Sequence, residues 1–322
     1  MPPRPRVLGG GMTSRVVQYR RFGGPEVLEV TEREDPVPGA GQVRLAVRAA
    51  AVNPLDWKLR LGAMAKGDAP PEPRVPGFDV AGVVEAVGEG VTAFAVGDEV
   101  AGRSTGGAYA EKALADARAL VAKPTAVSWE TAASLPVVTT TAYRVLDLLG
   151  LGEGDHTGTT LVVDGASGGV GVYAVQLAVA RGATVVGTAG PAHQEDVRAL
   201  GATPVVYGDG LVDRVRAVAP QGVDVALETA GKGALRDLVE LTGSPDKVIT
   251  IADYPGSQEL GVVFSSGGDP DEEARALTDA LARVADGRYR TTAVVTYALD
   301  EAGRAQEDNQ HGRVSGKLVL VP

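Results

Sequence analysis

The sequence predicts an α/β protein in which a β-rich region precedes a parallel, doubly wound sheet. The 322 residues are enough for two domains at roughly 150 residues each. Residues 15–121 carry short alternating apolar stretches broken by Gly and Pro, a pattern that indicates strands and hairpins. From Trp129 onward helical periodicity alternates with short β-rich stretches, which is typical of a parallel sheet with crossover helices.

The β-rich region shows its pattern best in VRLAVRAAAV (43–52) and in the apolar stretches of residues 80–102. Both segments alternate apolar and polar residues and are interrupted by turn residues, so we expect a compact, partly closed β structure. Residues 1–13 are basic and lack an apolar stretch, which predicts a disordered tail and not a secretory signal.

The α/β region begins after Ser128, a plausible helix N-cap. Five β-rich stretches separated by helix-length segments follow, namely TLVVDG (160–165), ATVVGTAG (183–190), PVVYG (204–208), VDVALETAG (223–231) and KVITIADY (247–254). After a Gly/Asp-rich loop at 265–272 comes one amphipathic helix, and the final strand-like segments resemble the first third of the chain.

Composition excludes several classes of function. The chain has no cysteine, so it forms neither a disulfide nor a thiolate metal site, and we expect a cytoplasmic protein. The formal charge of −10 makes nucleic acid an unfavourable partner. The apolar stretch at 170–180 is about half the length of a membrane-spanning helix, and we see no basic amphipathic helix, so no membrane association is expected.

A glycine-rich turn follows the stretch 160–165 and precedes a helix, with Gly165, Gly168 and Gly171 spaced three apart. Such a turn needs glycine for its dihedral angles and for the close approach of a diphosphate to the backbone. The helix N-terminus then offers free N–H groups to the phosphates. The alternative is a purely structural turn. The predicted cofactor-binding residues of the turn are Gly165, Ala166, Ser167, Gly168, Gly169, Val170 and Gly171.

The end of the second β-rich stretch indicates which dinucleotide binds. An NAD site usually places an Asp or Glu there, but this chain has Gly187 to Gly190. The missing carboxylate favours NADPH over NADH. No Arg or Lys follows at once, and the nearest candidates for a phosphate contact are His193, Gln194 and Arg198. Thr188, Ala189, Gly190 and His193 are therefore predicted to contact the cofactor.

The order of motifs in the chain is that of a known family. The motifs are AVNPLDWKLRLG (51–62), PGFDVAGVVEAVGEGV (76–91), GDEVAG (97–102), AASLPVVTTTAYRVL, GASGGVG and GRVSGKLVL. The sequence resembles the zinc-free quinone oxidoreductase-like group of the medium-chain dehydrogenase/reductase superfamily over nearly all of residues 14–322. The resemblance implies a GroES-like catalytic domain at 14–135 and 272–322, a Rossmann NADP-binding domain at 136–271, and an active site in the cleft between them.

The resemblance also bears on quaternary structure and on zinc. Family members often form homodimers through the edge of the cofactor domain's sheet, which would place VITIADY (248–254) at an interface. Zinc-dependent relatives carry an early Cys, a Gly-His-Glu segment and a four-Cys lobe, whereas this chain has Gly77-Phe78-Asp79 and no cysteine. The three histidines of the chain are scattered, so we expect no metal site and no Lewis-acid route to alcohol oxidation.

Three candidate catalytic residues, Asn53, Asp56 and Lys58, match the family's loop that faces nicotinamide and substrate. Quinone reductases often have a tyrosine where Lys58 stands, and this departure brings an enone or enoyl thioester close to quinone as the expected acceptor. The structural alternatives are a turn at Asn53-Pro54, a helix cap at Asp56 and a solvated Lys58.

Three further cofactor contacts come from the same resemblance. Thr139–Thr141 match the helix start that touches the nicotinamide ribose, with Thr141 the predicted contact. Their alternative role is a hydroxyl-rich helix turn. Tyr207 matches a tyrosine near the adenosine phosphate, and Lys317 matches a C-terminal lysine that reaches the cofactor.

Together these observations predict an NADPH-dependent, zinc-free reductase. It would transfer hydride to a quinone or an activated alkene, with Lys58 and Asn53 polarising the acceptor and water supplying the proton. The alternative from another class is a structural or regulatory protein that binds NADPH without turnover.

Overall fold

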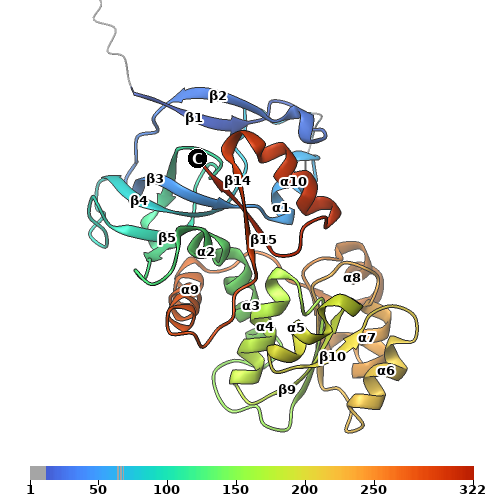
Figure 1. Ribbon diagram of the computed structural model, residues 1–322. Helices are drawn as coiled ribbons and strands as arrows, with labels where there is room; N and C mark the ends of the chain where they lie inside the picture. Colours follow the sequence, from blue (N-terminus) through green and yellow to red (C-terminus); the bar gives the residue numbers. More distant parts are fainter. Residues whose placement is uncertain (1–11, 64, 66, 68) are drawn as a thin grey trace, which may run out of the picture. The chain divides into compact units, whose positions relative to one another are not determined.

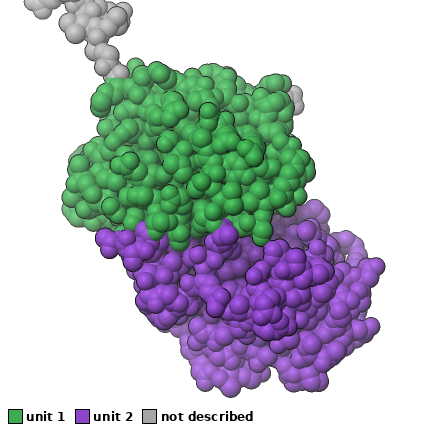
Figure 2. All heavy atoms as spheres, viewed as in Figure 1, with its two compact units in different colours: residues 1–123, 128–134, 294–322 green, residues 124–127, 135–293 purple. Residues whose placement is uncertain are grey.

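The computed structural model describes residues 12–322 except Met64, Lys66 and Asp68. The described residues form two compact units (Figure 2). Unit 1 contains the described residues through Lys123 together with Ser128–Ser134 and Val294–Pro322, and unit 2 contains Pro124–Val127 and Leu135–Ala293. The predicted tail lies mostly outside the described residues, and its last residue, Thr13, begins the first strand.

Unit 1 is built on a seven-stranded sheet with the path β14-β15-β3-β4-β5-β7, and β6 also pairs with β3. Its strands are β3 (Gln42–Ala51), β4 (Asp79–Val87), β5 (Glu99–Arg103), β6 (Lys112–Asp116), β7 (Leu120–Ala122), β14 (Val294–Ala298) and β15 (Lys317–Val321). A separate antiparallel pair joins β1 (Thr13–Gln18) to β2 (Glu29–Glu34). The helices are α1 (Pro54–Arg60), α2 (Trp129–Ser134) and α10 (Ala302–His311), with short 3-10 turns η1 (Pro25–Val27), η2 (Ala117–Ala119) and η5 (Leu299–Glu301).

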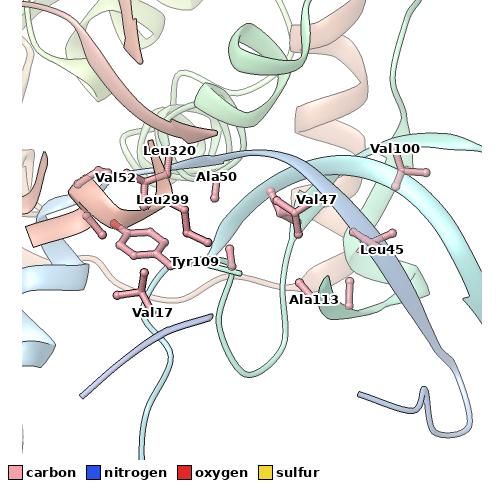
Figure 3. Packing of buried hydrophobic residues seen from close by; sticks show 14 of the residues in the cluster. Val17, Leu45, Val47, Ala50, Val52, Val100, Tyr109, Ala113, Leu299 and Leu320 are labelled. Atoms are coloured by element: carbon pink, nitrogen blue, oxygen red, sulfur yellow. The ribbon is translucent and has the colours of Figure 1, made fainter. Parts of the chain in front are cut away.

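The core of unit 1 follows from the alternation in β3. Val43, Leu45 and Val47 are buried while the residues between them are partly exposed, as the period of two in a strand requires. Burial of such a side chain stabilises the fold by roughly 1.5–3 kcal/mol. Tyr109 inserts its ring into the same core beside Leu299 (Figure 3). A phenol in an apolar core needs a polar partner for its hydroxyl.

Unit 2 contains a six-stranded, entirely parallel sheet in the order β10-β9-β8-β11-β12-β13. Its strands are β8 (Thr160–Asp164), β9 (Thr184–Ala189), β10 (Thr203–Val206), β11 (Val225–Glu228), β12 (Val248–Thr250) and β13 (Val263–Phe264). Its helices and 3-10 turns are α3 (Pro136–Leu148), α4 (Gly169–Ala180), η3 (Pro191–His193), α5 (Gln194–Ala199), α6 (Leu211–Val218), α7 (Leu235–Thr242), η4 (Pro245–Lys247), α8 (Tyr254–Leu260) and α9 (Pro270–Ala285).

The strand order of unit 2 reverses between β8 and β11. The chain runs outward from β8 through β9 to β10, then crosses back to β11 and runs outward through β12 to β13. Because parallel crossovers are right-handed, the two halves carry their helices on opposite faces. Helix α3 packs on α4 and α9, whereas α7 packs on α6 and α8 (Figure 1). This reversal makes the carboxyl ends of β8 and β11 the topological switch point, where open α/β sheets bind ligands. The predicted fold class is confirmed.

One boundary differs from the sequence-based division, which assigned residues from 272 onward to the catalytic domain. Helix α9 belongs to unit 2, and the chain enters unit 1 again only at Val294. The amphipathic face of α9 buries Leu277 and Leu281, and α9 packs against α3, where Tyr143 donates a hydrogen bond to Asp279. The sequence showed an amphipathic helix but not which sheet it covers.

Within the part of the chain that the structure describes, no helix is both long and apolar enough to cross a membrane.

Candidate cofactor and active site

The glycine turn lies at the carboxyl end of β8. Gly165 has a φ of +82°, in the left-handed region that favours glycine, and Gly168 is the N-cap of α4. The N–H of Gly168 donates to the carbonyl of Gly165 at 2.9 Å. A Cβ on Gly171 would lie 2.2 Å from that same carbonyl oxygen. The turn therefore keeps bare backbone at the start of a helix, as a diphosphate site requires.

Backbone and hydroxyl groups fasten this turn to the neighbouring strands. The amide of Ala166 donates to the carbonyl of Thr188 at 2.9 Å, and the amide of Gly165 donates to the Thr188 hydroxyl at 3.1 Å. The Thr229 hydroxyl donates to the carbonyl of Asp164 at 2.8 Å. The predicted residues of the turn and of the end of β9 are thus brought together at one edge of the sheet.

An aromatic ring and a cation lie beyond the end of β9. A Cβ on Gly190 would lie 3.6 Å from the ring of Tyr207, and the ammonium of Lys232 lies 5.5 Å from the centroid of that ring. Sequence reasoning missed Lys232 because it looked for cations only in the chain directly after β9. The signal was the lysine in TAGKG after β11, since the ends of parallel strands meet at one edge.

Two other predicted cofactor contacts in unit 2, His193 and Thr141, are not hydrogen-bonded to the glycine turn among the described residues. His193 shares a 2.9 Å contact between its Nδ1 and Asp196, within the same exposed segment. Thr141 is buried in α3, the helix whose Val138 would meet a Cβ on Gly169 at 3.1 Å. Val138 and Thr141 are three residues apart and so share one face of α3. Thr141 therefore lies one turn of α3 beyond Val138, the residue that faces the start of α4.

A buried polar network in unit 1 contains two of the candidate catalytic residues. Lys317 donates a hydrogen bond to Asn53 Oδ1, and Asn53 Nδ2 donates to Asp79 at 2.9 Å. Asp56 Oδ2 accepts from the Asn53 amide at 2.8 Å, which caps α1, and from the Tyr109 hydroxyl at 2.9 Å. Asn53 and Asp56 are each 2% exposed and Lys317 is 7% exposed, so α1, β4 and β15 meet at this network.

Burial controls the ionisation of this network. It raises the pKa of Asp56 from 3.8 to about 7, opposed by hydrogen bonds from Asn53 and Tyr109. Burial also lowers the pKa of Lys317, while the carboxylates of Asp79 and Asp56 oppose that change. The Tyr109 hydroxyl has a pKa well above its ordinary value because it is buried beside Asp56. The network therefore holds Asp56 largely protonated below neutral pH.

Lys58 differs from the other two candidate catalytic residues, Asn53 and Asp56, because it is only partly buried. Its ammonium lies 5.7 Å from the centroid of the Trp57 ring, and the Trp57 indole donates to Asn309 at 2.9 Å. The indole is thereby fixed to α10, and Lys58 rests over a fixed surface. Of the three candidates, Lys58 alone is not buried, so its charge is accessible outside the buried network.

Two segments of the chain match known protein families. Residues 39–125 match the alcohol dehydrogenase GroES-like domain, and residues 169–261 match the family described as zinc-binding dehydrogenase. A quinone oxidoreductase from Lama guanicoe is 32% identical over 333 residues, covering 97% of this chain and 98% of the relative. The chain belongs to the quinone oxidoreductase-like medium-chain dehydrogenases/reductases.

Solved structures agree with this assignment. A quinone oxidoreductase from Pseudomonas syringae pv. Tomato DC3000 superimposes with a TM-score of 0.81 at 27% identity, over 96% of this chain and 100% of that one. A mycobacterial protein complexed with NADPH has a TM-score of 0.83 at 26% identity, also over 96% and 100% of the two chains. The predicted family is confirmed, and this medium-chain dehydrogenase/reductase is an oxidoreductase.

The zinc-binding name of the second matched family contrasts with the residues of this medium-chain dehydrogenase/reductase. Phe78 stands in the segment where zinc-dependent relatives have histidine, and the next residue, Asp79, accepts the hydrogen bond from Asn53. Among the described residues, no group of three or more His, Cys, Asp or Glu side chains is arranged to hold a metal ion.

Replacement of Gly171 by alanine should weaken dinucleotide binding. The added methyl would lie 2.2 Å from the Gly165 carbonyl oxygen, so the turn must open. We expect the dissociation constant to rise about tenfold or more, or ~1.4 kcal/mol. Fluorescence titration with NADPH measures this change. Gly152→Ala is the matched control, because its methyl would meet only Asp147 at 3.4 Å or more; equal affinities of the two variants would contradict the prediction.

Asp56 should make the stability of the protein depend on pH. The pKa of its carboxyl is about 7 in the folded protein and 3.8 ordinarily, so the unfolded chain loses this proton first as pH rises. The contribution of protonated Asp56 to the free energy of unfolding is complete below about pH 4. It falls by about 1.4 kcal/mol per pH unit as pH rises and is lost by about pH 7. Urea unfolding at several pH values should show this slope, and Asp56→Asn should remove it. Parallel curves for the two proteins would refute the assignment.

Proposed function

We propose that this protein is an NADPH-dependent, zinc-free reductase whose acceptor is a quinone or an activated alkene such as an enone or enoyl thioester. The observation that carries the cofactor assignment is the glycine turn at the switch point, where the adjoining strand β9 ends in Thr188, Ala189 and Gly190 without a carboxylate. The acceptor assignment rests on the similarity to quinone oxidoreductases and on Lys58.

The chain's residues fit a phosphorylated dinucleotide. The turn from Gly165 to Gly171 would hold the diphosphate through backbone N–H groups. Tyr207 and Lys232 would face the adenosine end, where a lysine favours an added 2′-phosphate. The mycobacterial relative was solved as a complex with NADPH. When bound, this cofactor supplies the hydride and its electron pair.

The residues of α1 would act on the acceptor. The Lys58 ammonium is the group suited to stabilise negative charge on an acceptor oxygen, because it is a cation outside the buried network. The side-chain amide of Asn53 is hydrogen-bonded to Lys317 and to Asp79, so this N-cap residue orients α1, the helix that carries Lys58. Water then supplies the proton to the reduced acceptor.

Zinc-free chemistry is supported by the composition of the chain. Thiolate ligands are impossible without cysteine, and the segment that carries a histidine ligand in zinc-dependent relatives reads Gly77-Phe78-Asp79. Polarisation of the acceptor then falls to side chains, with Lys58 foremost.

We further propose a cytoplasmic homodimer that forms through the edge of the unit 2 sheet. β13 is the last strand in the sheet order and pairs only with β12 among the described strands. Val263 of β13 is 46% exposed, and Tyr254, at the start of the preceding helix α8, is 56% exposed. An edge strand with one unpaired side and exposed apolar side chains favours association with a second chain.

The proposal is tested by titration of the purified protein with NADPH and NADH, followed by addition of 1,4-benzoquinone, a small enone and crotonyl thioester. We expect selective binding of NADPH and its oxidation, which is monitored by the absorbance of the reduced cofactor. The acceptor that is reduced identifies the substrate class. Binding without turnover would favour a non-catalytic NADPH-binding protein. Absence of binding would refute the cofactor assignment.

Lys232→Ala should reduce the preference for NADPH. Removal of the ammonium beside Tyr207 removes a charge partner for the 2′-phosphate, which NADH lacks. We expect the dissociation constant for NADPH to rise about tenfold, or ~1.4 kcal/mol, while that for NADH changes little. Lys247→Ala, at the opposite edge of the sheet before β12, is the control. An equal loss for both dinucleotides would argue against a phosphate contact.

Lys58→Ala should slow turnover by about 100-fold or more, as expected when one electrostatic donor to a developing anion is removed. NADPH affinity should stay within about twofold, since the proposed contact of Lys58 is with the acceptor and the diphosphate is proposed to bind the glycine turn. Steady-state kinetics and fluorescence titration separate the two effects. Only a small loss of rate would eliminate the role proposed for this lysine.

A further inference from the structure

Four polar side chains form a row across the centre of the unit 2 sheet. β8 and β11 are in register with Asp164 opposite Glu228, and Glu228 is opposite Thr250 of β12. Thr188 of β9 continues the row on the other flank, where its hydroxyl lies 2.5 Å from Asp164 Oδ1. All four residues are at most 2% exposed. The two carboxyl groups therefore occupy adjacent strands at the switch point, with a hydroxyl on each side.

The hydrogen bonds of the two threonines fix the direction of their hydroxyl protons. Thr188 Oγ1 accepts from the Gly165 amide at 3.1 Å and donates to Asp164. Thr250 Oγ1 accepts from the amides of Ala252 and Asp253, each at 3.1 Å, and donates to Glu228 at 2.5 Å. Each hydroxyl thus gives its single proton to a carboxyl oxygen. The same Thr188 hydroxyl also receives the first amide of the glycine turn.

The central carboxyl groups disfavour simultaneous ionisation. Neighbouring strands lie about 4.8 Å apart, and a carboxylate on one strand raises the proton affinity of a carboxyl group on the next. Burial raises the pKa of Asp164, while the Thr188 hydroxyl and Lys232 lower it and Asp237 of α7 raises it further. Burial likewise raises the pKa of Glu228, opposed by Thr250 and by the amides of Gly231 and Ala230, with Asp164 acting to raise it.

A dinucleotide brings more negative charge to this row. Asp164 directly precedes the glycine turn, and its carbonyl and carboxyl groups both belong to the hydrogen bonds that hold the turn. A diphosphate on that turn repels ionised carboxylates at the same edge of the sheet. The end of β9 has no carboxylate, whereas each of the two strands that border the switch point ends in a carboxyl residue. Protonation removes that repulsion.

We propose that Asp164 and Glu228 are positioning residues of the cofactor site that must share at least one proton for NADPH to bind, so that binding takes up a proton from solvent. A solvent proton adds to a carboxylate oxygen of the pair, and no other bond changes. The protonated pair keeps both threonine hydrogen bonds, so the turn stays anchored while its negative charge falls. This inference rests on the proposed cofactor.

The experiment is isothermal titration of the full-length protein with NADPH from pH 6 to pH 9, in two buffers of different ionisation enthalpy. We expect proton uptake of up to one per cofactor and a dissociation constant that rises up to tenfold per pH unit as the free pair ionises. Asp164→Asn and Glu228→Gln should each flatten this rise by removing one ionisable member. All proteins share the titration of the ligand's own 2′-phosphate, so their difference isolates the pair.

Two further measurements separate the possible outcomes. Asp246→Asn, an exposed carboxyl directly before β12 and so at the opposite edge of the sheet, should titrate as the wild type does. Circular dichroism checks that each variant is folded, and the two single variants test the pair independently. Identical slopes in the wild type and both variants would overturn the inference while leaving the cofactor assignment standing. Failure of every protein to bind NADPH or NADH would overturn both.

Discussion

Thr188 connects the glycine turn to the end of β9 in the candidate cofactor site of unit 2. Its carbonyl receives the amide of Ala166, and its hydroxyl receives the amide of Gly165 while donating to Asp164. These three bonds hold the first residues of the glycine turn against the end of β9. The N-terminus of α4, the left-handed Gly165 and the close approach at Gly171 all depend on that register. A residue without a hydroxyl at this position would leave the Gly165 amide and the Asp164 carboxyl without their partner, which is costly in a buried site.

In unit 1, buried charged side chains position the candidate catalytic residues at the start of α1. Lys317 comes from the last strand and Asn53 precedes α1, yet the two side chains are hydrogen-bonded beside Asp79. Arg60, at the other end of α1, is fully buried and donates to Gln306 of α10 at 2.6 Å. Buried ionic groups are expensive to desolvate, and the bonds of Arg60 to Gln306 and to the Gly23 carbonyl offset part of that cost. The position of α1, and so of Lys58, is fixed from both ends.

Much of this architecture could be predicted from local patterns, because strand alternation, the strand-turn-helix at the glycine motif and the order of motifs are all local in sequence. The domain assignment of α9 was not predictable, since amphipathicity shows that a face is buried but not against which sheet. Lys232 and the pair Asp164 and Glu228 were missed for a similar reason. Asp164 ends β8, whereas Glu228 ends β11 and Lys232 follows it, and only the register of the sheet brings the ends of these two strands together beside the turn. Lys317 was predicted to contact the cofactor, and its observed partner, Asn53, is 264 residues away.

The discontinuity of unit 1 has a consequence for the order of folding. β14 and β15 belong to unit 1 but follow all of unit 2 in the chain, and Leu318 and Leu320 of β15 complete the unit 1 core. During synthesis the whole of unit 2 therefore emerges before unit 1 has its last two strands. Until then β3 lacks its partner β15, and Asn53 lacks the ammonium of Lys317. Unit 2 is able to fold first, as domains commonly do during synthesis, and the candidate catalytic segment at Asn53 takes its final form last.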